Sequence, residues 1–359
     1  MAQIIAIANQ KGGVGKTTTA VNLAASLAVA EQRTLLIDGD PQGNATSGFG
    51  LEGEQLTKTV YDALIGELPL ADVILRAIQF AHLDVAPTTP DLAGAEIELI
   101  DRENRELAMY DAIAPIRDRY DYILIDCPPS LGLLTINMLA AADAVLIPVQ
   151  CEYYALEGLS QLLNTVHRIQ QSVNPKLAID GVLLTMYDAR LNLSRQVVTD
   201  AREYFGPKVF ETIIPRNVRL AEAPSFGKPI VLYDIASVGA QAYLSVAREI
   251  VQRNASAPTI SVEPTAELTE PAEDTSEHPS ENAAEHPTEQ ATEQATEHAT
   301  EQAKEAASEH TPDFLPPPTD TAVDQSPTPG TLADAPPTDD STEPANIAQP
   351  PIVEQQPEA

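Results

Sequence analysis

The sequence of 359 residues contains no tryptophan and only two cysteines, Cys127 and Cys151. Two cysteines cannot make the disulfide framework of a small secreted domain, so we expect reduced thiols. No stretch approaches the roughly 20 apolar residues that a membrane-spanning helix needs. The first ten residues lack the basic segment of a secretory signal peptide and run into a glycine-rich loop. These absences favour a cytoplasmic protein without a membrane span.

Basic residues are scarce, and acidic residues outnumber them by 53 to 21, which gives a formal net charge of −32. The imbalance is largest in residues 255–359. This segment contains 23 acidic residues, a single basic residue (Lys304), 17 of the 30 prolines and no tyrosine. It carries too little apolar surface to offset the chain entropy that folding removes. We therefore expect a disordered acidic tail at 255–359 and one globular domain at 1–254.

Short apolar runs alternate with helical segments through the globular part. The runs are nearly continuous in Ile, Leu and Val, which is typical of strands covered on both faces; they lie at 4–8, 34–37, 83–86, 122–125, 144–149, 181–185 and 209–214. Helices are expected at 20–30, 91–114, 132–141, 155–172, 194–204 and 236–253. The alternation predicts an α/β fold with a doubly wound, mainly parallel sheet. Ligands of such sheets bind beyond the carboxyl ends of the strands.

The first apolar run leads into the glycine-rich loop Lys11, Gly12, Gly13, Val14, Gly15, Lys16, Thr17 and Thr18. Because a strand is expected before this loop and a helix after it, the sequence indicates a phosphate-binding P-loop. The backbone N–H groups of the loop would converge on phosphate oxygens at the positive end of the helix. Lys16 would reach the β- and γ-phosphates, and the Thr17 hydroxyl would ligate Mg²⁺.

Three aspartates follow buried runs. Asp126 ends the run at 122–125, which is the position of a Walker B acid that holds Mg²⁺ through water. Asp38 and Asp40 follow the run at 34–37. An aspartate at the end of a strand is often only a turn or cap residue, so the role of Asp40 depends on its sequence context.

That context resembles a known family. Lys11 at the front of the loop marks the deviant Walker A class of P-loop NTPases. Together with the segments at 37–50, 121–139, 148–163, 183–190 and 214–230, the loop resembles the ParA/Soj chromosome-partitioning ATPases of the MinD/ParA superfamily. The resemblance extends over about 1–253 and does not include the tail.

The resemblance implies a homodimer that closes over two ATP molecules, in which Lys11 of each subunit reaches the nucleotide of the other. It assigns catalytic roles to Lys11, Lys16 and Asp40, of which Asp40 would organise the attacking water. It places Asp38 near Thr17 and the metal, and Pro215 and Asn217 in the adenine pocket. It also implies slow hydrolysis that a ParB-type centromere-binding partner stimulates.

A DNA-binding surface is expected despite the acidic composition, because phosphate contacts are local. Residues 160–230 contain nine basic and six acidic residues, whereas residues 1–159 contain nine basic and 22 acidic residues. A surplus of this size is often only a solvated surface. The resemblance points to Arg190 and Arg219, with Arg195, Lys208 and Arg216 as further candidates. Because no helix-turn-helix segment precedes the loop, we expect sequence-independent binding to double-stranded DNA and a nucleoid-associated protein.

Two alternatives belong to other classes. A MinD-like membrane-associated ATPase for division-site placement would end in a basic amphipathic helix. The expected helix at 236–253 carries only Arg248 and Arg253, so we expect no membrane partner. An iron–sulfur carrier would use two cysteines per chain, but Cys127 and Cys151 form no Cys-x-x-Cys pair and are expected to be buried and structural.

Overall fold

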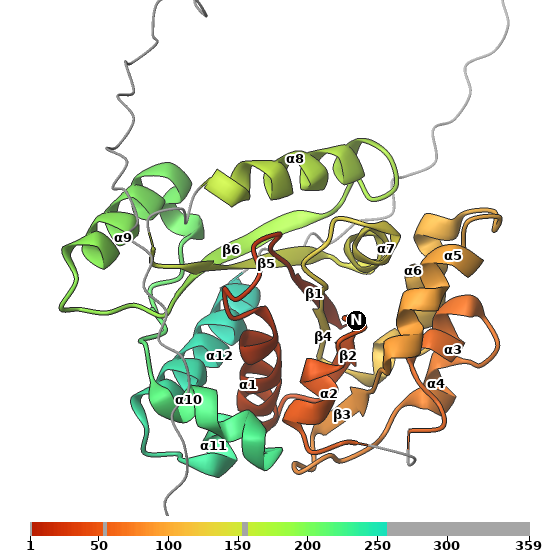
Figure 1. Cartoon of the computed structure of the whole chain (residues 1–359), viewed down its shortest axis with the longest axis horizontal. Helices are drawn as coiled ribbons and strands as arrows, with labels where there is room; N and C mark the ends of the chain where they lie inside the picture. The colour runs from red at the N-terminus through yellow and green to blue at the C-terminus, as the bar shows by residue number, and fades with distance from the viewer. Residues whose placement is uncertain (1, 53–55, 153–156, 257–359) are drawn as a thin grey trace, which may run out of the picture. The chain divides into compact units, whose positions relative to one another are not determined.

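The computed structural model describes residues 2–52, 56–152 and 157–256. Apart from its first two residues, the acidic tail predicted at 255–359 lies outside the described residues. Six strands form one parallel sheet in the order β3-β2-β4-β1-β5-β6 (Figure 1). They are β1 (Gln3–Ile7), β2 (Thr34–Asp38), β3 (Leu83–Ala86), β4 (Tyr122–Asp126), β5 (Ala144–Gln150) and β6 (Ala178–Thr185).

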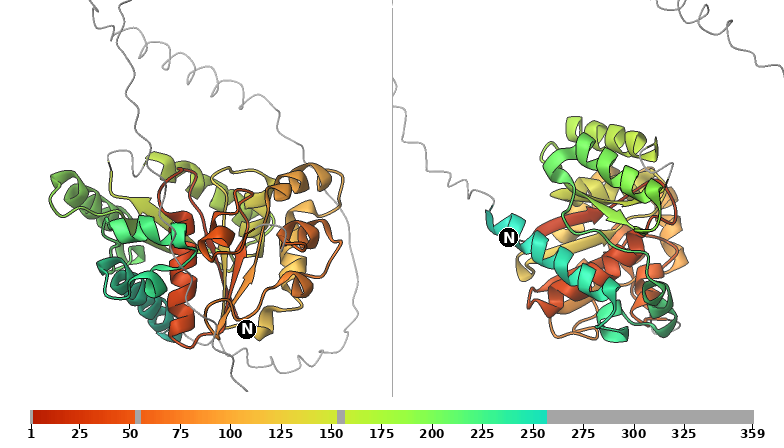
Figure 2. Two further views of the ribbon diagram at one scale, coloured as in Figure 1. Left: turned by 60° about the horizontal axis from the view of Figure 1, so that its bottom comes forward. Right: turned by 90° about the vertical axis from the view of Figure 1, so that its left-hand side faces the viewer.

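Both faces of the sheet are covered, because successive side chains of each strand point to opposite sides. Ile5 and Ile7 of β1 belong to a core with α1 (Lys16–Val29) and α12 (Val238–Ser256). Ile4 and Ala6 belong to the opposite core, which includes helices α3 (Val60–Ile65), α6 (Ala108–Ile113), α7 (Leu133–Ala141), α8 (Glu157–Gln171) and α9 (Asn192–Phe205). Figure 2 shows the sheet between these layers. The arrangement confirms the predicted doubly wound α/β fold.

The connections that leave β1 and β4 run to opposite sides of the sheet. β1 leads through α1 to β2, towards the β3 edge, whereas β4 leads through α7 to β5, towards the β6 edge. The carboxyl ends of β1 and β4 therefore border the point at which the strand order reverses, which is where open α/β sheets bind ligands. The glycine-rich loop follows β1 at this point.

The strand predicted at 209–214 is wrong. This segment lies beside β6, where the N–H groups of Phe210 and Ile214 donate to the Val182 and Leu184 carbonyls (3.0 and 2.8 Å), but the pairing is limited to isolated bridges at Val209 and, just beyond the segment, at Pro215. The backbone N–H groups of Glu211 and Thr212 donate to the carboxylate of Glu249 (2.9 and 3.2 Å). A side chain of α12 therefore takes the donors between Phe210 and Ile214, which interrupts the ladder.

The single helix predicted at 91–114 is also wrong. The segment consists of η2 (Pro90–Gly94), α5 (Ala95–Glu98), η3 (Arg105–Leu107) and α6. Asn104 has a φ of 54°, in the left-handed region, so an α-helix cannot pass through it. The other long helices were predicted to within a few residues, except that α1 begins at Lys16 rather than at residue 20.

Several short elements were not predicted, because they have too few residues for a periodic pattern. They are α3, whose bounds are given above, and α2 (Asn44–Gly48), α4 (Leu70–Val73), η4 (Arg117–Arg119), η5 (Gly206–Lys208), α10 (Val218–Glu222), η6 (Ala223–Phe226) and α11 (Ile230–Tyr233). Among the described residues, no helix combines the length and the apolar character that a membrane span requires.

Candidate functional site

The glycine-rich loop connects β1 to α1 in a conformation that depends on glycine. Gly13 and Gly15 have φ angles of 74° and 90°, which side chains with a Cβ rarely adopt. α1 begins directly after Gly15, and no side chain caps its first turn. The free N–H groups of that turn, with the helix dipole behind them, form a site for an anion.

Two neighbouring strands hold the loop in place. The Asn9 amide donates to the Pro148 carbonyl of β5 (2.7 Å), and its oxygen accepts from the Lys11 N–H (3.0 Å). On the other side, the buried Thr185 hydroxyl, at the end of β6, donates to the Val14 carbonyl (2.8 Å). Thr185 had not been predicted to belong to the site, because its partner lies 171 positions away in the sequence.

Lys16 places a cation beneath the loop. Its side chain belongs to a residue that is only 7% exposed, and its ammonium donates to the Lys11 carbonyl (3.4 Å). Burial lowers the pKa of Lys16, while the charges of Asp126 and Asp40 act in the opposite direction. Within the described part of the chain Lys16 forms no ion pair. An anion bound next to this buried lysine would therefore stabilise its charge.

Asp38 and Asp126 lie opposite each other on β2 and β4, and both are completely buried. Asp38 accepts hydrogen bonds from the Thr46 N–H and hydroxyl (both 2.7 Å). Neither carboxylate oxygen of Asp126 has a hydrogen-bond partner among the described residues. Burial, and secondarily the charge of Asp38, raises the pKa of Asp126 well above its ordinary value, although the nearby Thr17 side chain counteracts this. Such a carboxylate is suited to a cation.

Asp40 is held in a tight turn next to this pair. Its N–H donates to Asp38 Oδ1 (3.3 Å), and its own Oδ1 accepts from the Gln42 N–H (3.0 Å). The turn is pressed against β4 at Gly39, where an added Cβ would lie 2.8 Å from the Asp126 carbonyl oxygen. Gly39 was not predicted to belong to the site; only the packed structure shows that any side chain there would clash with the Asp126 carbonyl and the Met138 side chain.

The described residues contain no group of three or more His, Cys, Asp or Glu side chains that could hold a metal ion by themselves. The predicted set of Thr17, Asp38 and Asp126 fits a different kind of site. Mg²⁺ at a P-loop keeps waters and takes phosphate oxygens, so it needs few protein ligands. The carboxylate of Asp126, which has no hydrogen-bond partner among the described residues, would supply the fixed negative charge that such an ion needs.

A cavity of about 220 Å³ lies beside the loop. It brings the loop residues Gly15 and Thr18 together with Pro215 and Asn217, and its other lining residues are Thr185, Met186, Ile214, Arg216, Leu220, Ala221 and Tyr243. Asn217 caps α10, since its oxygen accepts from the Arg219 N–H (2.7 Å). Its amide nitrogen has no hydrogen-bond partner in the described part of the chain. The cavity is therefore largely apolar with one free amide.

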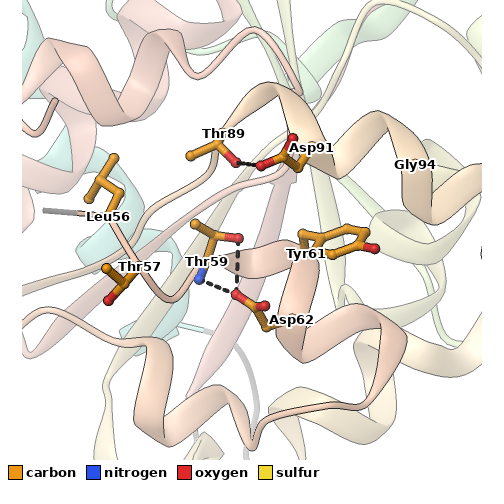
Figure 3. Close-up of a pocket in the computed structure, with 8 residues that line it drawn as sticks. All are labelled: Leu56, Thr57, Thr59, Tyr61, Asp62, Thr89, Asp91 and Gly94. Atoms are coloured by element: carbon orange, nitrogen blue, oxygen red, sulfur yellow. Dashed lines mark hydrogen bonds between the residues drawn. The ribbon is translucent and has the colours of Figure 1, made fainter. Parts of the chain in front are cut away.

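A second cavity has another character (Figure 3). Its polar side chains bond to one another: Thr59 donates to Asp62 at the start of α3, and Thr89 donates to Asp91. None of the predicted nucleotide-binding residues lines it. We therefore place the candidate site at the glycine-rich loop and not in this cavity.

Three of the five predicted DNA-binding residues gather at the turn between β6 and α9. Arg190 pairs with Asp188, Arg195 bonds to Asn192, and Arg216 lies close enough to lower the pKa of Asp188. Arg219 lies on α10 and pairs with Glu222 (2.9 Å). Lys208 follows α9, so the 14-residue helix, about 21 Å long, separates it from Arg190. Lys208 therefore lies apart from the candidate DNA-binding arginines at the turn between β6 and α9.

Cys127 and Cys151 are buried and form no disulfide. Burial raises the pKa of the Cys151 thiol to about 11, and that of Cys127 further still. Both thiols are therefore protonated at neutral pH, in keeping with small apolar side chains in the core.

Comparisons with known proteins agree with this geometry. A family model described as an AAA domain matches residues 2–179. The chain is 59% identical over 252 residues to the chromosome partitioning protein ParA of Myxococcus xanthus, covering 70% of this chain and 89% of the relative. It is 59% identical over 250 residues to the sporulation initiation inhibitor protein Soj of Bacillus subtilis, covering 70% of this chain and 98% of the relative.

Among solved structures, cobyrinic acid a,c-diamide synthase from Mycobacterium smegmatis with bound ADP and magnesium superposes with a TM-score of 0.63. It shares 37% sequence identity, and the match covers 71% of this chain and 96% of the other.

Proposed function

We propose, from the premise that this chain belongs to the ParA/Soj family of chromosome-partitioning ATPases, that it is an ATP-dependent dimerising switch that binds DNA non-specifically. Hydrolysis of ATP, stimulated by a ParB-type partner, would release the DNA and drive partitioning of the chromosomal origin. Residues 1–254 are the ATPase domain in this proposal, and 255–359 are an appended acidic tail.

One observation carries the proposal. The buried ammonium of Lys16 and the buried carboxylate of Asp126 lie near the uncapped start of α1, and within the described residues neither forms a salt bridge, although each feels the charge of the other. Burying charged groups that have so few polar partners is costly for an isolated fold, since the Lys16 ammonium has only the long bond to the Lys11 carbonyl (3.4 Å). A nucleotide phosphate together with Mg²⁺ satisfies both, because it brings an anion to Lys16 and a cation to Asp126.

The residues of the loop bind and orient the phosphates. The N–H groups of residues 12–18 at the start of α1 and the ammonium of Lys16 neutralise the phosphate charge. Thr17 and Asp126 hold Mg²⁺, Asp126 through water. Asp38 fixes the position of Thr46 next to them by accepting two hydrogen bonds from it. The metal ion supplies charge neutralisation to the phosphoryl oxygens.

Asp40 orients the water that attacks the γ-phosphate. One of its oxygens holds the turn, and the other has no hydrogen-bond partner in the described chain and can accept from water. Lys11 completes the site of the partner subunit in the ATP-bound dimer. Hydrolysis is consequently slow until dimerisation and the ParB-type protein complete the arrangement.

Pro215 and Asn217 bind the adenine base. Their cavity adjoins Gly15 and Thr18, so a base seated there lies next to the phosphate loop. The free amide of Asn217 donates to an acceptor on the edge of the base, while the apolar lining covers its faces.

The exposed arginines at Arg190, Arg195, Arg216 and Arg219 contact the DNA backbone. Dimerisation duplicates this surface, which raises the number of phosphate contacts without any base-specific contact. We expect Lys208 to contribute less, because it lies at the other end of α9.

The membrane-associated alternative has no support from α12. Arg253 is engaged with Glu249 (2.7 Å) and lies over the ring of Phe210 (4.1 Å to the centroid). Arg248 is exposed, but a single free basic side chain on α12 does not make the cationic face that anionic lipid requires.

The test measures binding to a DNA duplex of arbitrary sequence with ATP, with ADP and without nucleotide. We expect binding with ATP only, and no ATP-dependent binding to anionic vesicles. Arg190→Glu should remove DNA binding while the ATP-bound dimer still forms, and Lys208→Glu is the matched control with the same charge change. If Arg190→Glu keeps the full, salt-sensitive affinity for DNA, the proposed DNA-binding surface is wrong. If the unmodified protein with ATP binds vesicles and not DNA, the proposed DNA-binding function is wrong.

Asp40→Ala tests the proposed switch. It should hydrolyse no ATP and remain as a DNA-bound dimer when the ParB-type partner is added. If the variant leaves DNA as fast as the unmodified protein, Asp40 does not organise the attacking water.

A further inference from the structure

The turn after β6 holds an aspartate and an arginine in a fixed relationship. The Arg190 backbone N–H (3.0 Å) and Nε (2.9 Å) both donate to Asp188 Oδ1, and Arg190 Nη2 donates to Asp188 Oδ2 (2.7 Å). The Leu191 N–H donates to the Asp188 carbonyl (3.0 Å). Asp188 is therefore bonded to Arg190 through both side chain and backbone.

The two members of this pair differ in exposure. The Asp188 side chain is 12% exposed, whereas the Arg190 side chain is 86% exposed. The carboxylate lies beneath the guanidinium and does not cover it. A guanidinium has five N–H donors, and the pair uses only two, so the remaining three face solvent. Asp188 thus leaves the outer edge of Arg190 free to bind an anion.

The turn has a fixed position relative to the nucleotide site. Thr185, three residues before Asp188, is bonded to the Val14 carbonyl of the glycine-rich loop. The Tyr187 N–H donates to the Ile214 carbonyl (3.1 Å), and the Arg216 N–H donates to the Tyr187 carbonyl (2.9 Å). These bonds bring Arg216 next to Asp188. The Arg216 side chain pairs with Glu152 (3.4 Å), and its charge also lowers the pKa of Asp188, so Asp188 holds Arg190 directly and interacts with Arg216 only through charge.

We propose that Asp188 is a positioning residue that holds Arg190 in the orientation in which it contacts a DNA backbone phosphate. This inference rests on the proposed DNA-binding function. A long arginine side chain loses rotamer freedom when it binds, and a side chain that is already held loses less. An acidic residue in the DNA-binding surface then strengthens binding, although its charge repels phosphate.

The two physical effects of Asp188 have opposite signs, which makes the proposal testable. Charge alone predicts tighter DNA binding when Asp188 is neutralised. Loss of positioning predicts weaker binding. The geometry favours the second outcome, because the acid that holds Arg190 is largely covered and leaves the outward donors of the guanidinium unused.

The experiment compares Asp188→Asn with Asp200→Asn by measuring DNA affinity with ATP across a series of salt concentrations. Asparagine keeps an oxygen for the Arg190 N–H and Nε but replaces Oδ2, the acceptor of Nη2, with a donor. Asp200 lies on α9 and accepts from Gln196, so its variant makes the same charge change away from Arg190. Melting temperature and ATP affinity are measured on the same proteins.

We expect Asp188→Asn to bind DNA about three- to tenfold more weakly than Asp200→Asn. Its plot of log affinity against log salt should be shallower, by about 0.9 for each DNA phosphate that the variant no longer neutralises. An effect of misfolding would lower melting temperature and ATP affinity as well, whereas positioning affects DNA affinity alone.

Affinity of Asp188→Asn equal to or above that of Asp200→Asn, while Arg190→Glu still abolishes binding, would overturn this inference and leave the proposed function intact. Absence of any ATP-dependent, Arg190-dependent DNA binding by the unmodified protein would overturn both.

Discussion

Asp38 and Asp126 lie opposite each other in the register of β2 and β4, and yet, among the described residues, donors within hydrogen-bond distance reach Asp38 and not Asp126. Two neighbouring buried carboxylates repel each other when both are ionised, and each has lost its hydration. In the folded protein without ligand, the repulsion between these carboxylates is therefore uncompensated, and a bound cation would reduce it. This relationship makes the stability of the site dependent on pH and on magnesium.

The first prediction concerns the free energy of unfolding of the nucleotide-free protein. Burial raises the pKa of Asp38 to about 6 and that of Asp126 well above its usual value. An unfolded aspartate titrates near 4, so between the two values the folded state binds more protons. The stabilisation from these groups is present at low pH and is lost as pH rises through the folded pKa.

We expect Asp126→Asn to lose less stability than the unmodified protein between pH 4.5 and pH 8, by on the order of 1–3 kcal/mol. Thermal melts of both proteins across this range, without nucleotide, measure the difference. If the stability of the two proteins changes equally with pH, ionisation of Asp126 does not destabilise the folded state. The same variant should gain no stability from Mg²⁺ with ATP beyond that from ATP alone.

The second prediction separates the two lysines of the loop. Lys16→Ala should abolish ATP binding, because it removes the buried cation that faces the phosphates. Lys11→Ala should still bind ATP but fail to dimerise, because Lys11 acts in the partner's site. Calorimetric titration with ATP and light scattering distinguish the two outcomes, and equal loss of ATP binding in both variants would contradict the division of roles.

The third prediction concerns Thr185, whose hydroxyl holds the glycine-rich loop through the Val14 carbonyl. Thr185→Val keeps the shape of the side chain but leaves that carbonyl without its partner, at a cost of about 1–3 kcal/mol. We expect a higher KM for ATP with a smaller change in kcat, and Thr185→Ser should restore KM. An unchanged KM for ATP in Thr185→Val would show that the hydrogen bond from Thr185 to the loop does not contribute to ATP binding.

The fourth prediction separates the two roles of Asn217. Asn217→Asp keeps the oxygen that caps α10 through the Arg219 N–H, and aspartate is an equally good cap. It removes the amide donor of a residue that lines the cavity. We expect unchanged melting temperature and at least tenfold weaker ATP binding, on the order of 1.4 kcal/mol. If ATP affinity is retained, Asn217 is only a cap and the base is recognised elsewhere.

Much of the nucleotide site could be predicted because its residues follow local rules. A glycine loop between a strand and a helix, and aspartates at the ends of Ile- and Leu-rich strands, mark the same edge of a parallel sheet. Gly39 and Thr185 could not be found in this way. Their importance comes from contacts with Asp126 and Val14, which are distant in sequence.

The two wrong elements fail for different reasons. The run at 209–214 has the composition of a strand, but the Glu249 carboxylate on α12 binds two of its N–H groups, so a distant contact overrides the local preference. The segment at 91–114 has the composition of a helix, but Asn104 takes a left-handed conformation that interrupts it.

The sequence by itself determined the α/β class, the glycine-rich loop, the strand-end aspartates and the confinement of most negative charge to 255–359. These properties depend on composition, on periodicity and on residues adjacent in the chain. Only the tertiary structure decided that Asp126 is buried without a hydrogen-bond partner among the described residues, that Lys208 lies apart from Arg190, and that Asp188 lies beneath Arg190 with Arg216 beside it. Packing decides these relationships, because burial and charge pairing depend on which distant segments come together in space.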